Sequence, residues 1–95
     1  MPSPSSKSAV HLLIHGRVQG VGFRYYTQEI ASELGLAGWV RNMPDGAVEA
    51  YAEGSRQALE AFIKHLHKGP PLSHVETIIP AWQTAKGTLP PFSIR

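Results

Sequence analysis

Residues 9–35 read AVHLLIHGRVQGVGFRYYTQEIASELG, and their hydrophobic period changes from two to about 3.6 within this segment. Val10, Leu12 and Ile14 alternate with the residues between them, which predicts a strand whose first set faces the core. After residue 22, apolar side chains recur at helical spacing, and they are Phe23, Tyr26, Ile30, Ala31 and Leu34. Gly35 stands where a left-handed residue ends a helix. The segment therefore predicts a strand, a loop and a helix in that order.

The predicted loop is Gly16-Arg17-Val18-Gln19-Gly20-Val21-Gly22, with three glycines in seven residues. Its backbone amides and those of the first helical turn can converge on one anion at the positive end of the helix dipole. Arg24 follows, and its guanidinium suits a phosphate or a carboxylate. However, Tyr25 replaces the third glycine of a dinucleotide-binding loop, and the Gly-Lys-Ser/Thr ending of a nucleotide loop is missing. The glycines alone leave two alternatives open, an anion site and a purely structural turn.

Two further strands are predicted after the helix. Trp39 and Val40 lead to the turn signal Pro44-Asp45-Gly46. Beyond this turn, period-two alternation resumes with Val48, Ala50 and Ala52. The pattern predicts two antiparallel strands joined by a hairpin.

A second helix and a fourth strand complete the pattern. Ser55 is predicted to cap the helix and Gly69-Pro70-Pro71 to end it, and its apolar stripe is Ala58, Leu59, Phe62, Ile63 and Leu66. Alternation then predicts a strand that closes near Pro80 and has one face made of Val75, Thr77 and Ile79. Phe92-Ser93-Ile94 is a candidate final strand, and the two prolines before it leave its pairing open.

The predicted order of elements is strand, helix, strand, strand, helix, strand. Right-handed crossovers in both halves place the two helices on the same side of the sheet. The fold class is therefore α+β, a ferredoxin-like β-α-β-β-α-β sandwich with an antiparallel sheet and two helices on one face. The side chains expected in the core include Phe23, Trp39, Phe62 and Ile63. Three further aromatics, Tyr25, Tyr51 and Trp82, either border a site or are partly exposed on a sheet face, and we favour the second alternative.

Length and composition fit one folded domain. The chain has 95 residues, of which 42% are hydrophobic. We expect a disordered tail over residues 1–8 and a single domain over residues 9–95. The sequence contains neither a signal-peptide pattern nor an apolar run long enough to span a bilayer. We therefore expect a cytoplasmic monomer that does not insert into membranes.

Several classes of site are disfavoured by the residues. The absence of cysteine excludes a disulfide scaffold, a thiolate nucleophile and cysteine-based metal sites. His65 and His67 point to opposite sides of one predicted helix, and His11 and His15 lie about 13 Å apart along a strand, so neither pair can chelate one ion. The nine Lys and Arg residues are spread singly and the net charge is +2, which argues against nucleic-acid binding. We expect no metal, no cofactor and no nucleic-acid partner.

Longer motifs carry a family resemblance. The segment from Gly16 to Arg24 is followed by Gly38-Trp39-Val40-Arg41-Asn42, and then by Asp45-Gly46, Glu53-Gly54 and Gly69-Pro70. In this order and at this spacing the motifs resemble the acylphosphatase family, over nearly everything between residues 11 and 79. The resemblance implies hydrolysis of acyl phosphates, the mixed anhydrides of carboxylic and phosphoric acids, to a carboxylate and inorganic phosphate.

The resemblance also implies roles for individual residues. Arg24 and Asn42 would be catalytic, with Asn42 positioning the attacking water. The phosphoryl group would be held by the Gly16–Arg24 loop through Gln19, Gly20, Val21, Gly22, Phe23 and Arg24. The only partner required is then a small acyl phosphate. A carboxylate leaves as an anion without a general acid, and loop amides and one Arg can stabilise the phosphoryl charge without a metal. The alternative is a non-catalytic module that binds phosphate or carbamoyl phosphate and acts with a partner protein.

Overall fold

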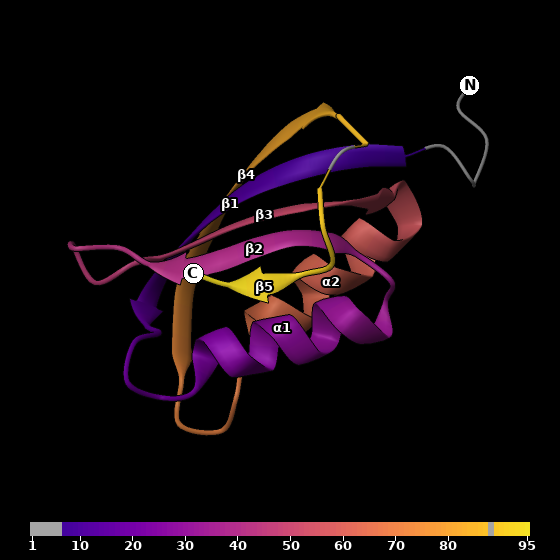
Figure 1. The fold of residues 1–95 in the computed structure, drawn as a ribbon. Coiled ribbons are helices and arrows are strands. Elements are labelled where there is room, and N and C mark those ends of the chain that lie inside the picture. Colours follow the sequence, from indigo (N-terminus) through magenta and orange to yellow (C-terminus); the bar gives the residue numbers. More distant parts are fainter. Residues whose placement is uncertain (1–6, 88) are drawn as a thin grey trace.

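The computed structural model describes residues 7–87 and 89–95. Its elements, shown in Figure 1, are β1 (Lys7–Arg17), α1 (Phe23–Glu33), β2 (Ala37–Asn42), β3 (Val48–Ser55), α2 (Arg56–Lys68), β4 (His74–Thr84) and β5 (Ser93–Ile94). The sequence predicts that residues 7 and 8 belong to a disordered tail, but β1 starts at Lys7, so they are strand residues. The rest of that predicted tail, residues 1–6, lies outside the described residues.

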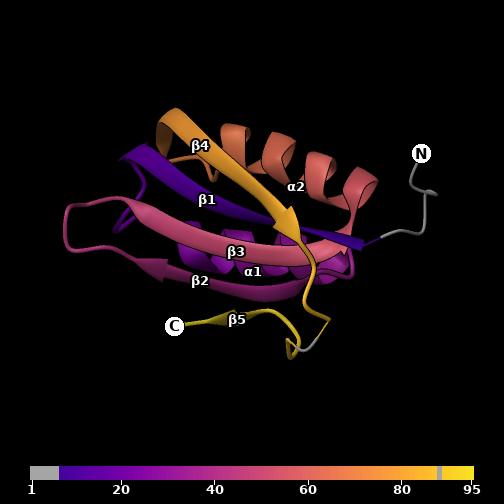
Figure 2. The ribbon, with the colours of Figure 1, turned by 90° about the horizontal axis from the view of Figure 1, so that it is seen from above.

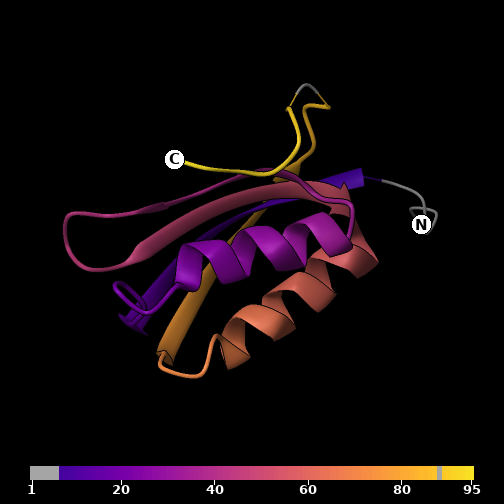
Figure 3. The same cartoon turned by 60° about the horizontal axis from the view of Figure 1, so that its bottom comes forward.

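The five strands form one sheet in the order β4-β1-β3-β2-β5. The pairs β1–β4, β1–β3 and β2–β3 are antiparallel, whereas β5 lies parallel to β2. Figures 2 and 3 show α1 and α2 side by side on the same face of the sheet. The ferredoxin-like β-α-β-β-α-β arrangement is therefore confirmed, and β5, whose pairing the sequence leaves open, adds a short parallel strand beside β2.

The core lies between the sheet and the two helices. Val10, Leu12 and Ile14 are fully buried, as their alternation predicts. They form one cluster with residues from both helices and from the other strands, among them Phe23, Ala31, Val40, Ala50, Leu59, Phe62 and Leu66. Phe92, which precedes β5, meets Phe62 edge to face at a centroid distance of 5.9 Å. This contact ties the C-terminal segment to the same core.

Trp39 lies on the helix-free face of the sheet, which contradicts its predicted place in the core. Its neighbour Val40 takes the buried position, so alternation turns Trp39 to the other face. There its ring stacks on Tyr51 at 6.3 Å between centroids, and the guanidinium of Arg95 lies 4.8 Å from its centre. Tyr51 is 9% exposed and is therefore more buried than predicted.

Strand β4 differs from its prediction in length and in phase. It lies at the edge of the described sheet, where its one neighbour is β1. An edge strand tolerates the missing amide of Pro80, so β4 continues to Thr84. A register shift between His15 and Gly16 breaks the alternation. As a result Val75 and Ile78 both pack against the core, whereas Ile79 is 50% exposed. The predicted face of Val75, Thr77 and Ile79 is wrong for this reason.

The helix ends agree with their sequence signals. The side chain of Ser55 accepts a hydrogen bond of 3.1 Å from the amide of Ala58, which confirms the predicted cap of α2. Gly69 follows α2 with a positive φ of 66°, and its amide donates to the carbonyl of His65. Within residues 7–87 and 89–95, neither helix has the length and apolar character needed to cross a membrane.

Glu53 is a buried carboxylate on β3 with three hydrogen-bond donors. It accepts from the amide of Lys86 at 2.8 Å, from the amide of Gly87 at 3.0 Å and from the Tyr51 hydroxyl at 2.9 Å. Burial by itself raises the pKa of Glu53, but these donors stabilise the ionised form and hold its pKa below the usual value. Burial, together with the hydrogen bond to Glu53, raises the pKa of Tyr51. Glu53 therefore anchors the segment after β4 to the middle of the sheet.

Replacing Glu53 by Gln is expected to lower the free energy of unfolding at pH 7 by about 2 kcal/mol, because charge-assisted hydrogen bonds become neutral ones. Since the pKa is depressed in the folded state, this stabilisation is present above the unfolded pKa and is lost as the pH falls through the folded pKa. Urea unfolding from pH 7 down to acid pH measures it. The exposed Glu60→Gln is the control, and an equal stability of Glu53→Gln and parent at pH 7 would contradict the assignment.

Candidate active site

The connection from β1 to α1 is built for an unusual backbone path. Gly20 and Gly22 have φ angles of 74° and 77°, a left-handed region that side chains other than glycine rarely adopt. Gly22 is also the N-cap of α1, so no side chain caps this helix, and its first turn contains no acidic residue. The backbone amides at the start of α1 therefore have no side-chain cap as hydrogen-bond acceptor.

The backbone amides of this segment are available to a ligand. Among the residues that the structure describes, no backbone or side-chain acceptor is bonded to the amides of residues 20–25, and the first bonded amide is that of Tyr26, which donates to Gly22 at 3.0 Å. Such unpartnered amides at the positive end of a helix favour an anion. This observation favours the anion site over the purely structural turn.

A cavity of about 130 Å³ opens at these amides. Arg24 lines it from the first turn of α1, and Asn42 lines it from the last position of β2. The remaining lining residues are Val18, Gly20, Gly22, Phe23 and Tyr25. The structure thus brings Asn42 beside the loop and Arg24, a proximity that the residues alone do not show. The cavity is smaller than the pockets of about 300–1,000 Å³ that hold drug-sized ligands, so it suits a compact group such as a phosphoryl group.

Two residues of the predicted phosphate-binding set do not line this cavity. Val21 is partly buried and packs against the core. Gln19 turns its side chain to the β2–β3 turn, where its Nε2 donates to the carbonyls of Met43 and Ala47, both at 2.8 Å. Any contact of Gln19 or Val21 with phosphate would come from their backbone amides, and this part of the set stays a prediction.

Tyr25 borders the site, in contrast to its prediction as a sheet-face aromatic. It belongs to the first turn of α1, lines the cavity and is 72% exposed. Trp82, the third aromatic of that prediction, packs at the edge of the core, with the Arg56 guanidinium 3.5 Å from its ring centre. Among the three aromatics, the structure places only Tyr25 at the candidate site.

An ion-pair network holds the end of β2 next to Asn42. Glu49 on β3 pairs with Arg41 and accepts from His11 on β1 at 2.7 Å. The hydrogen bond from His11 lowers the pKa of Glu49, burial opposes it, and Arg41 lowers it further. Arg41 therefore has a structural partner and does not line the cavity.

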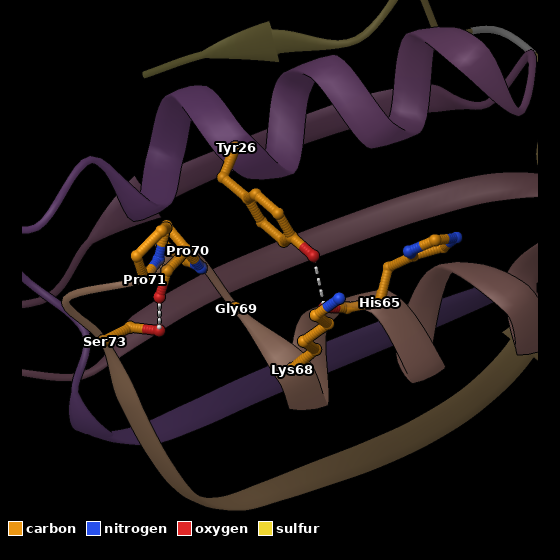
Figure 4. Close-up of a pocket in the computed structure, with 7 residues that line it drawn as sticks. All are labelled: Tyr26, His65, Lys68, Gly69, Pro70, Pro71 and Ser73. Atoms are coloured by element: carbon orange, nitrogen blue, oxygen red, sulfur yellow. Dashed lines mark hydrogen bonds between the residues drawn. The ribbon is translucent and has the colours of Figure 1, made fainter.

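A larger cavity of about 420 Å³ lies between the helices (Figure 4). Neither Arg24 nor Asn42 lines it. Its two hydroxyl groups are engaged, since Tyr26 donates to the carbonyl of His65 at 2.8 Å and Ser73 donates to that of Pro70 at 2.7 Å. The smaller cavity is therefore the candidate active site, because it combines unpartnered amides, a guanidinium and a carboxamide. Within the described ranges, no three His, Asp or Glu side chains gather as potential metal ligands.

Comparisons with known proteins point to one family. The acylphosphatase family model matches residues 10–94. An acylphosphatase of Trichormus variabilis is 47% identical over 90 residues, covering 92% of this chain and 89% of its own. The crystal structure of acylphosphatase from Bacillus subtilis superposes with a TM-score of 0.90 at 41% identity, covering 93% of this chain and 98% of its own. HypF of T. kodakarensis matches with a TM-score of 0.81 at 36% identity, but the match covers 93% of this chain and only 12% of HypF.

The family match and the relatives span almost the whole domain, including the loop, Arg24 and Asn42. The fold agrees in the order of its helices and strands, and the sequence motifs occur in the order that the resemblance requires. This chain belongs to the acylphosphatase family.

Proposed function

We propose that this chain hydrolyses the carboxyl–phosphate bond of acyl phosphates, with Arg24 and Asn42 as its catalytic residues. The observation that carries the proposal is that Arg24 and Asn42 line one small cavity together with loop residues whose backbone amides have no partner in the described part of the chain. The amides and the Arg24 guanidinium would hold the phosphoryl oxygens, and the Asn42 carboxamide would orient a water molecule.

The reaction needs little acid–base help from the protein. The oxygen of the water forms a bond to phosphorus, the bond from phosphorus to the acyl oxygen breaks, and its electron pair leaves with the carboxylate. A carboxylic acid has a pKa of about 4, so this leaving group departs as an anion. The proton of the water passes to a phosphoryl oxygen. The protein then supplies positioning and stabilisation of the charge on the equatorial oxygens, which amides and one guanidinium provide.

Steady-state hydrolysis of benzoyl phosphate, with and without a chelator, tests this proposal. We expect turnover well above the spontaneous rate and no effect of the chelator. The absence of turnover would contradict the enzymatic function, and loss of turnover with chelator would contradict the metal-free mechanism.

A second candidate is a non-catalytic module that binds phosphate or carbamoyl phosphate and acts with a partner protein. The match to a short part of the longer HypF chain favours it, because it places the same fold inside a larger protein. The two candidates differ in outcome. Saturable binding of inorganic phosphate without hydrolysis of any acyl phosphate would support the module over the enzyme.

We also propose that the chain works as a cytoplasmic monomer without a nucleic-acid partner. The scattered cations and the net charge of +2 support the last point. Light scattering of the purified protein tests the monomer, and a salt-dependent association with nucleic acid would contradict the proposal.

A further inference from the structure

The side chain of Gln19 joins the phosphate loop to the turn that follows Asn42. Its Nε2 donates to the carbonyls of Met43 and Ala47 at 2.8 Å each, so both of its N–H groups are used. The turn has a bond of its own, from the amide of Met43 to the carbonyl of Ala47 at 2.8 Å. We call the two bonds of Gln19 the carboxamide clamp.

The clamp acts directly after Asn42, at the end of β2. Asn42 is exposed, and β2 ends at this residue. On one side its backbone is held by the pairing of Asn42 with Val48, and on the other side the clamp holds Met43. In the described part of the chain no hydrogen bond orients the Asn42 side chain itself, so its position follows from its backbone.

We infer that Gln19 is a positioning residue, which holds Asn42 at the distance from the phosphate loop that the reaction requires. This inference rests on the proposed role of Asn42. A direct contact of the Gln19 side chain with phosphate is disfavoured, because both N–H groups serve the clamp and the remaining Oε1 is an acceptor that repels an anion. Small errors in the position of a reacting group cost large factors in rate, so the clamp matters for turnover more than for binding.

Gln19→Met tests the clamp, since methionine has a similar size and no donor. We expect kcat for benzoyl phosphate to fall about tenfold, while the inhibition constant of inorganic phosphate changes less than about twofold, because Arg24 and the loop amides remain. Gln19→Lys, whose ammonium can reach carbonyl oxygens, should recover part of kcat. A parallel rise of the phosphate inhibition constant in Gln19→Met would show a general collapse of the loop and would overturn the inference.

A double-mutant cycle with Asn42 makes the test specific. In the Asn42→Ala background, Gln19→Met should lower kcat by less than about twofold, since there is no carboxamide left to position. An equal loss in both backgrounds would overturn the role through Asn42. If Asn42→Ala alone leaves kcat unchanged, the proposed function of Asn42 has failed, and the inference falls with it.

A second, independent observation concerns the exposed ring of Tyr25. The cavity of about 130 Å³ is small, so the acyl group of a substrate whose phosphoryl group occupies it would extend toward its mouth. Side chains of a helix lean toward its N-terminus, which directs Tyr25 to the mouth of the cavity. Tyr26 and Tyr51 bond to His65 and Glu53, whereas Tyr25 is 72% exposed.

From this placement we propose that Tyr25 stacks on the acyl group and favours aromatic acyl phosphates over short aliphatic ones. The proposal rests on the proposed function. Tyr25→Ala should lower the ratio of kcat/KM for benzoyl phosphate to that for acetyl phosphate about three- to tenfold, as expected for one aromatic contact. Tyr25→Phe should keep the ratio, as should Leu72→Ala, an exposed residue that does not line the cavity.

The outcomes separate this proposal from the proposed function. An unaltered ratio in Tyr25→Ala, or an equal loss for both substrates, would overturn the role of Tyr25 while the hydrolase stands. If the parent hydrolyses neither substrate, the proposed function fails and the selectivity falls with it.

Discussion

Arg24→Gln is expected to lower kcat/KM for benzoyl phosphate about 10- to 150-fold and to weaken inhibition by inorganic phosphate. Arg24 lines the cavity from the first turn of α1, and in the proposed site its guanidinium would hold the phosphoryl group together with the unpartnered amides. A charge-assisted hydrogen bond contributes about 1.5 to 3 kcal/mol, and a bond that tightens as charge spreads over the equatorial oxygens lowers kcat as well as binding. Steady-state kinetics with phosphate as competitor measures both effects.

Two controls separate the geometry of Arg24 from its charge. Arg24→Lys keeps the charge without the planar fork of donors, so it should recover binding only in part. Lys64→Gln removes one positive charge from the exposed surface of α2 and should behave as the parent. If phosphate inhibited Arg24→Gln as strongly as the parent, Arg24 would not be a phosphate ligand.

Asn42→Ala is expected to lower kcat by about 10² while phosphate inhibition stays close to that of the parent. Asn42 lines the cavity from the end of β2, whereas the amides and the guanidinium that would hold the phosphoryl group belong to the loop and to α1. Its loss therefore removes the orientation of the water and leaves the phosphate ligands in place. Because Asn42 is exposed, the substitution leaves the core intact.

The control for Asn42 is another exposed carboxamide. Gln57→Ala lies on α2 and does not line the cavity, so its kcat should equal that of the parent. Thermal unfolding of both variants checks that the fold is retained. A kcat of Asn42→Ala within about twofold of the parent would exclude Asn42 from the reaction.

Local patterns predict most of this fold, and long-range contacts account for what they miss. The alternation of Val10, Leu12 and Ile14 and the helical stripe of α2 depend on one element each, so the sequence shows them directly. The phase of β4 depends on its register with β1, where a shift at His15 moves Ile79 outward. No periodicity within residues 75–79 carries that information.

The candidate site divides in the same way. The loop and Arg24 are adjacent in sequence, so the glycines indicate a loop that either binds an anion or forms a structural turn beside Arg24. Asn42 is 18 residues away from Arg24 in the sequence, and the sheet that contains β2 and β3 brings it to the cavity. Local patterns do not indicate this proximity, so a role for Asn42 follows from the family resemblance alone. The clamp of Gln19 could not be predicted, because its acceptors are backbone carbonyls of a distant turn, and any residue type supplies a carbonyl.

Titration of the isotope-labelled protein with inorganic phosphate, followed by NMR, tests most directly whether the loop amides, Arg24 and Asn42 form one site for a phosphoryl group. We expect saturable shifts of the backbone amides of residues 20–25 and of the Asn42 side-chain amide, and marked weakening of all of them in Arg24→Gln. Shifts confined to the larger cavity around Lys68 and Ser73, or no saturable shift at the loop, would contradict it.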